Sequence, residues 1–283
     1  MTSLFLGLLA ALCWGLHDFF VRDLSQKAPP IPLLAGVLAF GSVLLAPLAL
    51  MQGMGGMQGE VLAQAAGAGA AYVLASYGLY RAFAIGPVGL VAPICGAYPL
   101  GSMALALTSG QTVSALAWLA VLMVVGGIAL VARQADHGSS ATGQGKAAAI
   151  QWSVLAAVGF AMTFHLGQIA AHAGGELPAT LIARLVALTL VLAVLAVQRA
   201  SLRPALPHWR PLALMGALDV VALGAVLTSG SWPNPEFAAV TSSIFGIVTI
   251  LLAWRFLGES LGRIQALGVG IVFAGIALLA SGA

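Results

Sequence analysis

Residues 31–52 read IPLLAGVLAFGSVLLAPLALMQ, without a single charged side chain. A helix needs about 20 consecutive apolar residues to cross the hydrocarbon core of a bilayer, so this stretch predicts a transmembrane span. Comparable stretches follow one another along the chain, separated by short breaks at proline, glycine and charged residues. We expect ten spans, at 3–22, 31–52, 60–84, 87–108, 113–133, 148–171, 178–199, 209–230, 235–257 and 263–281. The chain is therefore predicted to be an all-α polytopic membrane protein.

The composition sets the kinds of partner that the chain can have. Charged residues make up 7% of the chain and hydrophobic residues 61%, whereas about a quarter of the residues in a soluble domain are charged. The net charge of +3 is scattered over span ends without a basic patch, so no nucleic acid is expected. The expected partners are membrane lipid and a small-molecule substrate. Faces rich in small residues also permit a homodimer without requiring one.

Signatures of enzymes and of cofactor sites are missing from the sequence. The chain contains no Walker loop and no HExxH motif, the usual marks of nucleotide and zinc chemistry. Cys13 and Cys95 lie far apart in apolar stretches and suggest neither a disulfide framework nor a zinc site. We therefore expect no enzyme, no cofactor, no metal and no ATP-driven pumping by this polypeptide alone.

The longest polar break divides the chain near its middle. Residues 134–146 are rich in Gly, Ser and Thr, a composition typical of flexible linkers. We expect a first five-helix repeat at 1–133, a flexible cytoplasmic linker at 134–147 and a second five-helix repeat at 148–283.

Landmarks in the two halves recur at one spacing. Gly86-Pro87 is matched 148 positions later by Asn234-Pro235, and Gly110-Gln111 by Gly258-Glu259 at the same shift. Because each half holds an odd number of spans, the second half must be inverted relative to the first. Inverted repeats are a common plan of secondary transporters, whose substrate site lies near the bilayer midplane between the repeats.

Lysine and arginine fall on one side of the predicted membrane. Ten of the 11 lie at the breaks that follow alternate spans: Arg22, Lys27, Arg81, Arg133, Lys146, Arg199, Arg203, Arg210, Arg255 and Arg263. Only Arg184 lies inside a span. The positive-inside rule makes this side cytoplasmic and turns both termini outward. Glu259 is four residues from both Arg255 and Arg263, which predicts two ion pairs that cap this face.

The end of the second half resembles a known family. The residues concerned are Phe256-Leu257-Gly258-Glu259-Ser260-Leu261, Gln265, Gly268 and Gly275, with Tyr80-Arg81-Ala82, Gly86-Pro87 and Pro99 in the first half. They resemble the EamA-type members of the drug/metabolite transporter superfamily, and the resemblance covers nearly the whole chain. Among these members the chain is most similar to the YddG-type amino-acid exporters. The resemblance implies two five-helix repeats and export of amino acids or similar small metabolites across the inner membrane.

Asp219 is the sharpest candidate for a functional group, because ionisable residues inside a span are costly. It lies about midway along the span at 209–230. Two interpretations stay open: a ligand for a substrate ammonium group or a proton, and a structural ion pair with a residue such as Arg184.

The end of the first span carries two more ionisable groups. His17 shares a helix face with Trp14 at a spacing of three residues, which makes both candidates for a transport pathway. Asp18 is four residues from Arg22, which predicts an ion pair at the interface. Adjacent helix positions point about 100° apart, so we do not expect His17 and Asp18 to face one cavity.

All four tyrosines lie in the third and fourth spans. An aromatic ring with a polar tip suits a cavity for an amphipathic solute, although an aromatic belt at the interface is the alternative. Aromatic and polar residues of the second half could complete such a cavity. The predicted lining residues are Trp14, His17, Tyr77, Tyr80, Tyr98, Phe164, His165, Asp219 and Ser243.

Together these features predict a secondary transporter that exports amino acids, aromatic or broad-range, or similar small metabolites by alternating access. An exporter of lipophilic cations is the first alternative, with Asp219 and the tyrosines as its site. A membrane enzyme acting on lipid is a remote alternative, for which His17 and Asp18 are the only candidate pair. We expect a bacterial-type inner-membrane location.

Overall fold

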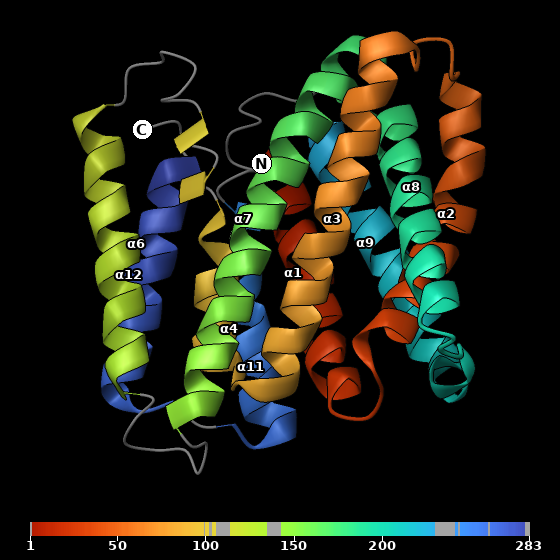
Figure 1. The fold of residues 1–283 in the computed structure, drawn as a ribbon. Helices are drawn as coiled ribbons and strands as arrows, with labels where there is room; N and C mark the ends of the chain where they lie inside the picture. The colour runs from red at the N-terminus through yellow and green to blue at the C-terminus, as the bar shows by residue number, and fades with distance from the viewer. Residues whose placement is uncertain are drawn as a thin grey trace.

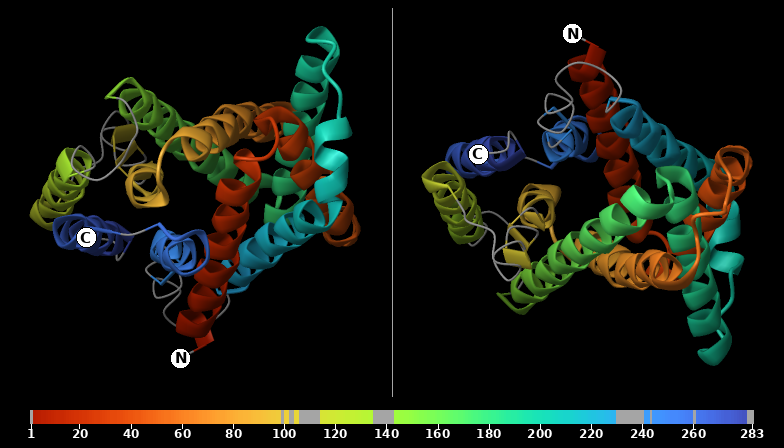
Figure 2. Two further views of the ribbon diagram at one scale, coloured as in Figure 1. Left: turned by 90° about the horizontal axis from the view of Figure 1, so that it is seen from below. Right: turned by 90° about the horizontal axis from the view of Figure 1, so that it is seen from above.

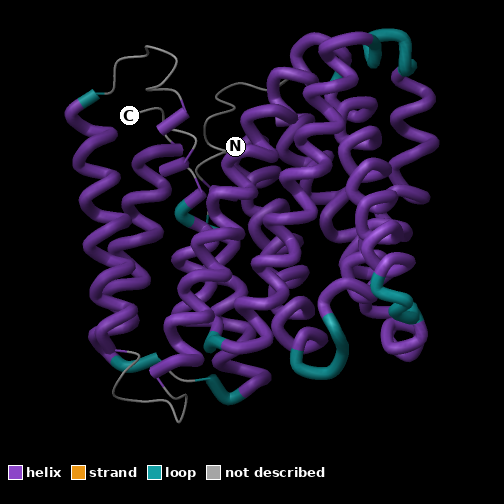
Figure 3. The backbone as a smooth tube through the Cα atoms, viewed as in Figure 1, coloured by secondary structure: helices purple, strands orange, loops and turns teal. Residues whose placement is uncertain are grey.

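The computed structural model describes residues 2–98, 100–101, 104–105, 114–134, 143–229, 241–242, 244–259 and 261–280. Within these residues all regular secondary structure is helical (Figures 1 and 3). The first half contains α1 (Thr2–Ser25), α2 (Pro30–Gln52), α3 (Gly59–Ile85), α4 (Val88–Gly96) and α6 (Ala115–Gln134). The second half contains α7 (Gly143–Gly174), α8 (Glu176–Val197), the 3-10 helix η1 (Arg203–His208), α9 (Trp209–Ser229), α11 (Phe245–Leu257) and α12 (Arg263–Ala280).

Each of the ten expected spans overlaps one of these α-helices. Five segments are long and apolar enough to cross a bilayer: Thr2–Ser25, Pro30–Gln52, Gly145–Gly174, Glu176–Val197 and Arg203–Val226. Shorter apolar segments lie within α6, α11 and α12. The ten-helix membrane architecture is therefore confirmed.

Two helix boundaries differ clearly from the expected spans. Helix α7 begins at Gly143, inside the stretch 134–147 expected to be a flexible linker. Helix α4 ends at Gly96, well before the expected end at 108. Ala97 is in a turn, and the described residues beyond it, 98, 100–101 and 104–105, are again helical, so the expected span is interrupted at Ala97.

Helix contacts follow a two-fold pattern that exchanges the halves. Helix α1 packs against α9 and α11, as its counterpart α7 packs against α3 and α4. Helix α2 packs against α9, as α8 packs against α3. Three further contacts, α2 with α8, α4 with α11 and α6 with α12, each join a helix to its own counterpart. In the views along the helices, α6 and α12 stand at one end and α2 and α8 at the other (Figure 2).

The two faces of the bundle carry different residues. Helix α1 begins and α12 ends toward the upper side in Figure 1, whereas α6 ends and α7 begins at the lower side. The described basic residues other than Arg184 belong to helix ends and connections of the lower side. The arrangement thus puts both chain ends opposite the basic face, as an inverted pair of five-helix repeats requires.

Glycine allows helices from opposite halves to touch through their backbones. A Cβ atom on Gly159 of α7 would lie 2.8 Å from the Cα of Ala75 on α3. On the neighbouring turns, a Cβ on Gly78 would lie 2.9 Å from the carbonyl oxygen of Trp152. Such distances leave no room for a side chain, so α3 and α7 pack as closely as small residues permit.

We expect Gly159→Ala to lower the free energy of unfolding by about 1–3 kcal/mol, the usual cost of overpacking. Thermal unfolding of the purified protein in detergent measures the change. Gly126→Ala on α6 is the matched control, because no atom lies within 4 Å of its added methyl group. Equal melting temperatures for the two variants would contradict the close packing of α3 against α7.

Candidate functional site

A cavity of about 330 Å³ lies between the two halves. This volume is at the lower end of the range for small-molecule sites. Its lining comes from α1, α3, α4, α7, α8, α9, α11 and Tyr98: Trp14, His17, Asp18, Ala68, Tyr72, Ser76, Leu79, Tyr80, Cys95, Tyr98, Phe160, Thr163, Phe164, Gly167, Gln168, Ala171, Glu176, Ala179, Thr180, Ala183, Arg184, Asp219, Leu223, Val226 and Phe245.

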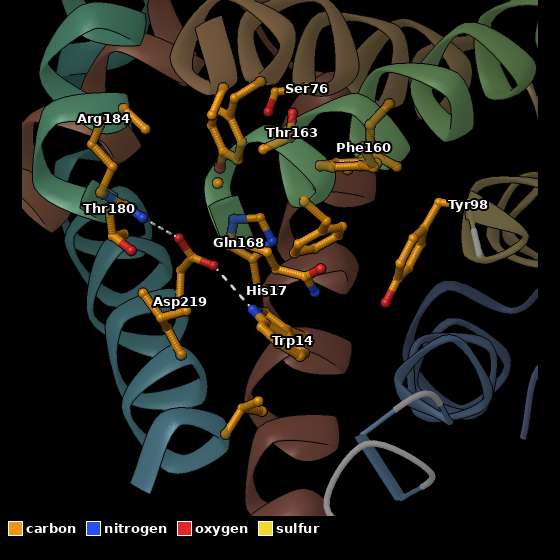
Figure 4. A pocket seen from close by; sticks show the side chains of 18 of the residues that line it. Trp14, His17, Ser76, Tyr98, Phe160, Thr163, Gln168, Thr180, Arg184 and Asp219 are labelled. Carbon is orange, nitrogen blue, oxygen red and sulfur yellow. Dashed lines mark hydrogen bonds and ion pairs between the residues drawn. The ribbon is translucent and has the colours of Figure 1, made fainter. Parts of the chain in front are cut away.

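One wall of the cavity carries an ion pair. Arg184 Nη1 on α8 donates a hydrogen bond to Asp219 Oδ2 on α9, and Trp14 Nε1 on α1 donates to Asp219 Oδ1 at 3.0 Å (Figure 4). The Arg184 side chain is only 6% exposed. A buried charge is tolerated when a partner and hydrogen bonds compensate it, and both carboxylate oxygens of Asp219 have a donor. Of the two interpretations left open for Asp219, the structure shows the ion pair with Arg184.

A glycine makes room for this arginine. A Cβ atom on Gly41 of α2 would lie 2.9 Å from the Cζ of Arg184. A Cβ on Gly216, three residues before Asp219, would lie 2.7 Å from the backbone nitrogen of Gly41. The guanidinium thus lies against the backbone of α2, close to the point where α2 touches α9.

The second polar group of the cavity is on α1. His17 Nδ1 and Asp18 Oδ1 are 3.1 Å apart, and both residues line the cavity. The expectation that they do not share a cavity is wrong: positions 14, 17 and 18 form one i, i+3, i+4 face of a helix, and the cavity is wide enough to include all of it. The expected Asp18–Arg22 pair is also wrong, because Arg22 contacts Glu259 instead.

The opposite wall is aromatic. The rings of Tyr98 and Phe164 are 4.8 Å apart at 37°, and Phe160 stacks on Phe164 at 6.4 Å and 29°. Tyr72 meets Phe160 edge-on at 6.3 Å. Figure 4 shows Tyr98 and Phe160 on one side of the cavity and Asp219 with Arg184 on the other. A solute with one charged end and one apolar ring would meet a suitable surface at each end.

Polar residues between the two walls had no clear signal in the sequence. Ser76, Thr163, Gln168 and Thr180 line the cavity (Figure 4). The Thr163 hydroxyl donates to the carbonyl of Gly159 at 2.8 Å. Hydroxyls and amides are common in membrane helices, where back-bonding of this kind is their usual role, so only their position in the fold distinguishes these four.

Three predicted lining residues do not form part of the cavity lining described here. The Tyr77 ring packs edge-on against Trp152 at 5.5 Å, which turns it away from the cavity. His165 is not among the lining residues of α7, which at this depth are Thr163, Phe164, Gly167 and Gln168. Ser243 lies outside the described residues. Trp14, His17, Tyr80, Tyr98, Phe164 and Asp219 are lining residues, and their roles stay predictions.

The cavity reaches toward one side of the bundle. Its lining includes Glu176, the first residue of α8, and Val226 near the end of α9. On α1 the lining stops at Asp18, and on α3 it stops at Tyr80. Beyond these two residues, toward the basic face, buried apolar side chains such as Leu24 pack into the main core. The described part of the cavity is thus closed toward the basic face.

Charged groups join the two halves beneath this core. Arg22 Nε lies 2.8 Å from Glu259 Oε1, and Arg22 Nη1 also donates to the carbonyl of Phe83. The N–H of Val88, the first residue of α4, donates to Glu259 Oε2 at 2.7 Å. The expected pairing of Glu259 with the arginines of its own half is therefore wrong, because α1 and α4 of the other half supply its donors.

Two inverted five-helix repeats around a central cavity are the architecture of a membrane transporter. The chain belongs to the EamA-like transporter family, which matches residues 1–133 and 147–281. It is therefore a multi-pass membrane transporter of small molecules, and the expected membership of the drug/metabolite transporter superfamily is confirmed. A search among curated proteins finds no match to the chain.

A solved structure described only as "Crystal structure of protein" shares the fold. It superposes with a TM-score of 0.66 at 15% sequence identity, over 98% of this chain and 95% of that one. The likeness extends over both halves and supports the fold alone.

We expect Arg184→Ala to lower the free energy of unfolding by about 3–5 kcal/mol, because it leaves the Asp219 carboxylate without its buried partner. Adding Asp219→Asn removes the remaining charge and should recover most of the loss. Thermal unfolding of Arg184→Ala, of Asp219→Asn and of the double variant measures this coupling. Lys27→Ala is the control, since its partner Asp23 is on the exposed end of α1 and such pairs contribute little. Additive losses for Arg184 and Asp219 would contradict the coupling.

Proposed function

We propose that the chain exports zwitterionic amino acids with aromatic or large apolar side chains by alternating access. The observation that carries the proposal is the two-sided cavity, in which charged groups of α1, α8 and α9 face a wall of aromatic rings. A zwitterion has an ammonium group for a carboxylate, a carboxylate for hydroxyl and amide donors, and a side chain for the rings. The volume of about 330 Å³ suits a single amino acid.

The orientation follows from the positive-inside rule. The basic face would be cytoplasmic, with both chain ends on the outer side of a bacterial-type inner membrane. The cavity, closed toward the basic face, would then be accessible from outside. This is the state in which an exporter releases its substrate.

The ion pair weighs against the lipophilic-cation alternative. That alternative placed the cation on Asp219, and Asp219 already has the Arg184 guanidinium as its counter-ion. Asp18 is the carboxylate that stays open to a cationic group, and the hydroxyl and amide groups of the lining favour a zwitterion over a lipophilic cation. The lipid-enzyme alternative needs a histidine and an acid at a membrane face. His17 and Asp18 lie in the cavity between the halves instead.

We expect proteoliposomes containing the purified protein to exchange labelled phenylalanine, tyrosine and tryptophan saturably. Phe164→Ala, and separately Tyr98→Ala, should raise the half-saturation concentration about five- to tenfold, because an aromatic contact is worth about 1 kcal/mol and 1.4 kcal/mol is tenfold. Tyr77→Phe is the control, since its ring contacts Trp152 outside the cavity. Transport of lipophilic cations in place of every amino acid would overturn the proposed substrate class.

Alternating access requires that the contacts closing the basic face can open. Two polar contacts connect the halves here: Arg22 with Glu259, and the N–H of Val88 with Glu259. The side chains of Arg22 and Glu259 are 16% and 19% exposed. Because water reaches this pair, its separation costs less than that of the enclosed Arg184–Asp219 pair. We propose that this cluster holds the outward-open state.

We expect Glu259→Gln to increase cytoplasmic access to the closed core about fivefold, equivalent to a pair worth about 1 kcal/mol. The reporter is a cysteine in place of buried Leu24, with Cys13 and Cys95 changed to alanine. Inside-out vesicles are labelled with a membrane-impermeant maleimide. Asp23→Asn is the control, because its pair with Lys27, four residues further along the chain, joins no second helix. Equal labelling rates for the two variants would contradict the role of the cluster.

A further inference from the structure

The charges in the cavity are unevenly compensated. Arg184 and Asp219 cancel each other and are fixed by geometry. Asp18 is 7% exposed, and the one side-chain partner that the structure describes for it is His17. A neutral imidazole leaves the Asp18 carboxylate uncompensated in a poorly solvated place, and such a charge costs several kcal/mol unless it is neutralised.

Among the residues that the structure describes, no other group around Asp18 supplies the missing positive charge. The titratable groups facing it from neighbouring helices are Tyr72 and Tyr80 on α3, Cys95 on α4 and Asp219 on α9. None of these is cationic. Arg184 on α8 is held by Asp219, and the described residues of α11 contribute no charge to the lining. Two ways to neutralise Asp18 stay open: a proton shared with His17, or a cation that enters the cavity.

The two ring nitrogens of His17 have different surroundings, and together they have the geometry of a proton acceptor. Its Nδ1 lies 3.1 Å from Asp18 Oδ1, and its Nε2 is buried with no partner among the described residues. One added proton can reside on either member of the pair and makes the pair neutral overall. Histidine and carboxylate side chains inside membrane proteins are common proton-binding groups, and here the two lie in contact at the cavity.

We propose that the His17–Asp18 pair binds one proton in competition with the ammonium group of the substrate. This deepens the proposed function, on which it depends for the substrate class. In the outward-open state a proton from outside would neutralise the pair and displace the amine. In the inward-open state the pair would lose that proton to the cytoplasm and accept the next amine. Each substrate molecule exported is thus exchanged for one proton, and the inward proton gradient drives export.

The cavity lining holds three carboxylates, Asp18, Glu176 and Asp219, and their surroundings differ. Asp219 receives hydrogen bonds on both oxygens from donors that stay protonated, an arginine and an indole. It needs no proton and holds Trp14 in place. Glu176, the first residue of α8, is exposed. Among the carboxylates that the structure describes, Asp18 alone combines cavity access, burial and a titratable partner.

Proton release on substrate binding tests the proposal directly. Tryptophan is added at saturating concentration to the purified protein in weakly buffered detergent at near-neutral pH, and a pH-sensitive dye reports the protons released. We expect release approaching one proton per protein. Asp18→Asn should abolish the release, while Asp23→Asn, outside the cavity, should leave it as in the wild type. Binding by the wild type without release would overturn the proposal.

Flux with an imposed gradient provides the second measurement. For one proton per substrate, a difference of one pH unit should give up to about tenfold accumulation. Asp18→Asn should reduce this to equilibration. His17→Gln keeps the carboxylate, so it should change the pH at which exchange is half-maximal, and it serves as the second variant should Asp18→Asn fail to fold. Gradient-driven accumulation in a folded Asp18→Asn protein, or an unchanged pH midpoint in His17→Gln, would overturn the proposal.

The two experiments give different results for a wrong proton site and for a wrong substrate class. Exchange of amino acids without proton release and without a response to the gradient leaves the substrate class intact and removes the proton site. Proton release caused by lipophilic cations, with no exchange of any amino acid, leaves the proton site intact and removes the substrate class.

Discussion

Hydrocarbon solvates neither charges nor free backbone groups, and this constraint arranges the whole molecule. The backbone satisfies it by forming helices, in which each segment bonds its own N–H and C=O groups. The side chains satisfy it through the places at which their charged groups lie. Charged groups of the described residues gather at helix ends, at the cavity, or in pairs that join helices. A charge in the interior therefore has a partner from another helix or access to the cavity, so polar contacts between helices coincide with the sites of function.

The same constraint explains why small residues matter here. Helices in lipid gain little from the hydrophobic effect and associate through close packing. Gly159 and Gly78 bring α3 and α7 into backbone contact, and Gly41 makes space for Arg184 beside α9. These close contacts between helices of opposite halves hold the two halves together beside the cavity. The polar contacts around Glu259 also join the halves, but they are reached by water.

The cavity combines groups that neither half provides alone. The first half supplies Trp14, His17 and Asp18, and the second half supplies Arg184, Asp219 and Phe164. Asp219 is held by a donor from each half, one on α1 and one on α8. A relative movement of the halves would therefore change the polar surface that a solute meets, which links binding to access.

The sequence by itself determined the number of spans, the two inverted halves and the side on which the basic residues lie. These depend on local properties, namely apolar length, odd span number and charge at the breaks. It also pointed to Trp14, His17, Tyr98, Phe164 and Asp219 as residues at the cavity, because polar or amphipathic groups inside spans are conspicuous. Only the tertiary structure decided the partners. Arg22 pairs with Glu259, and Asp18, one helical turn before Arg22, contacts His17 instead. Tyr77 turns to Trp152, while Thr163 and Gln168 enter the lining. Helical spacing gives the direction of a side chain about its own axis, but what lies in that direction depends on how the other helices are placed.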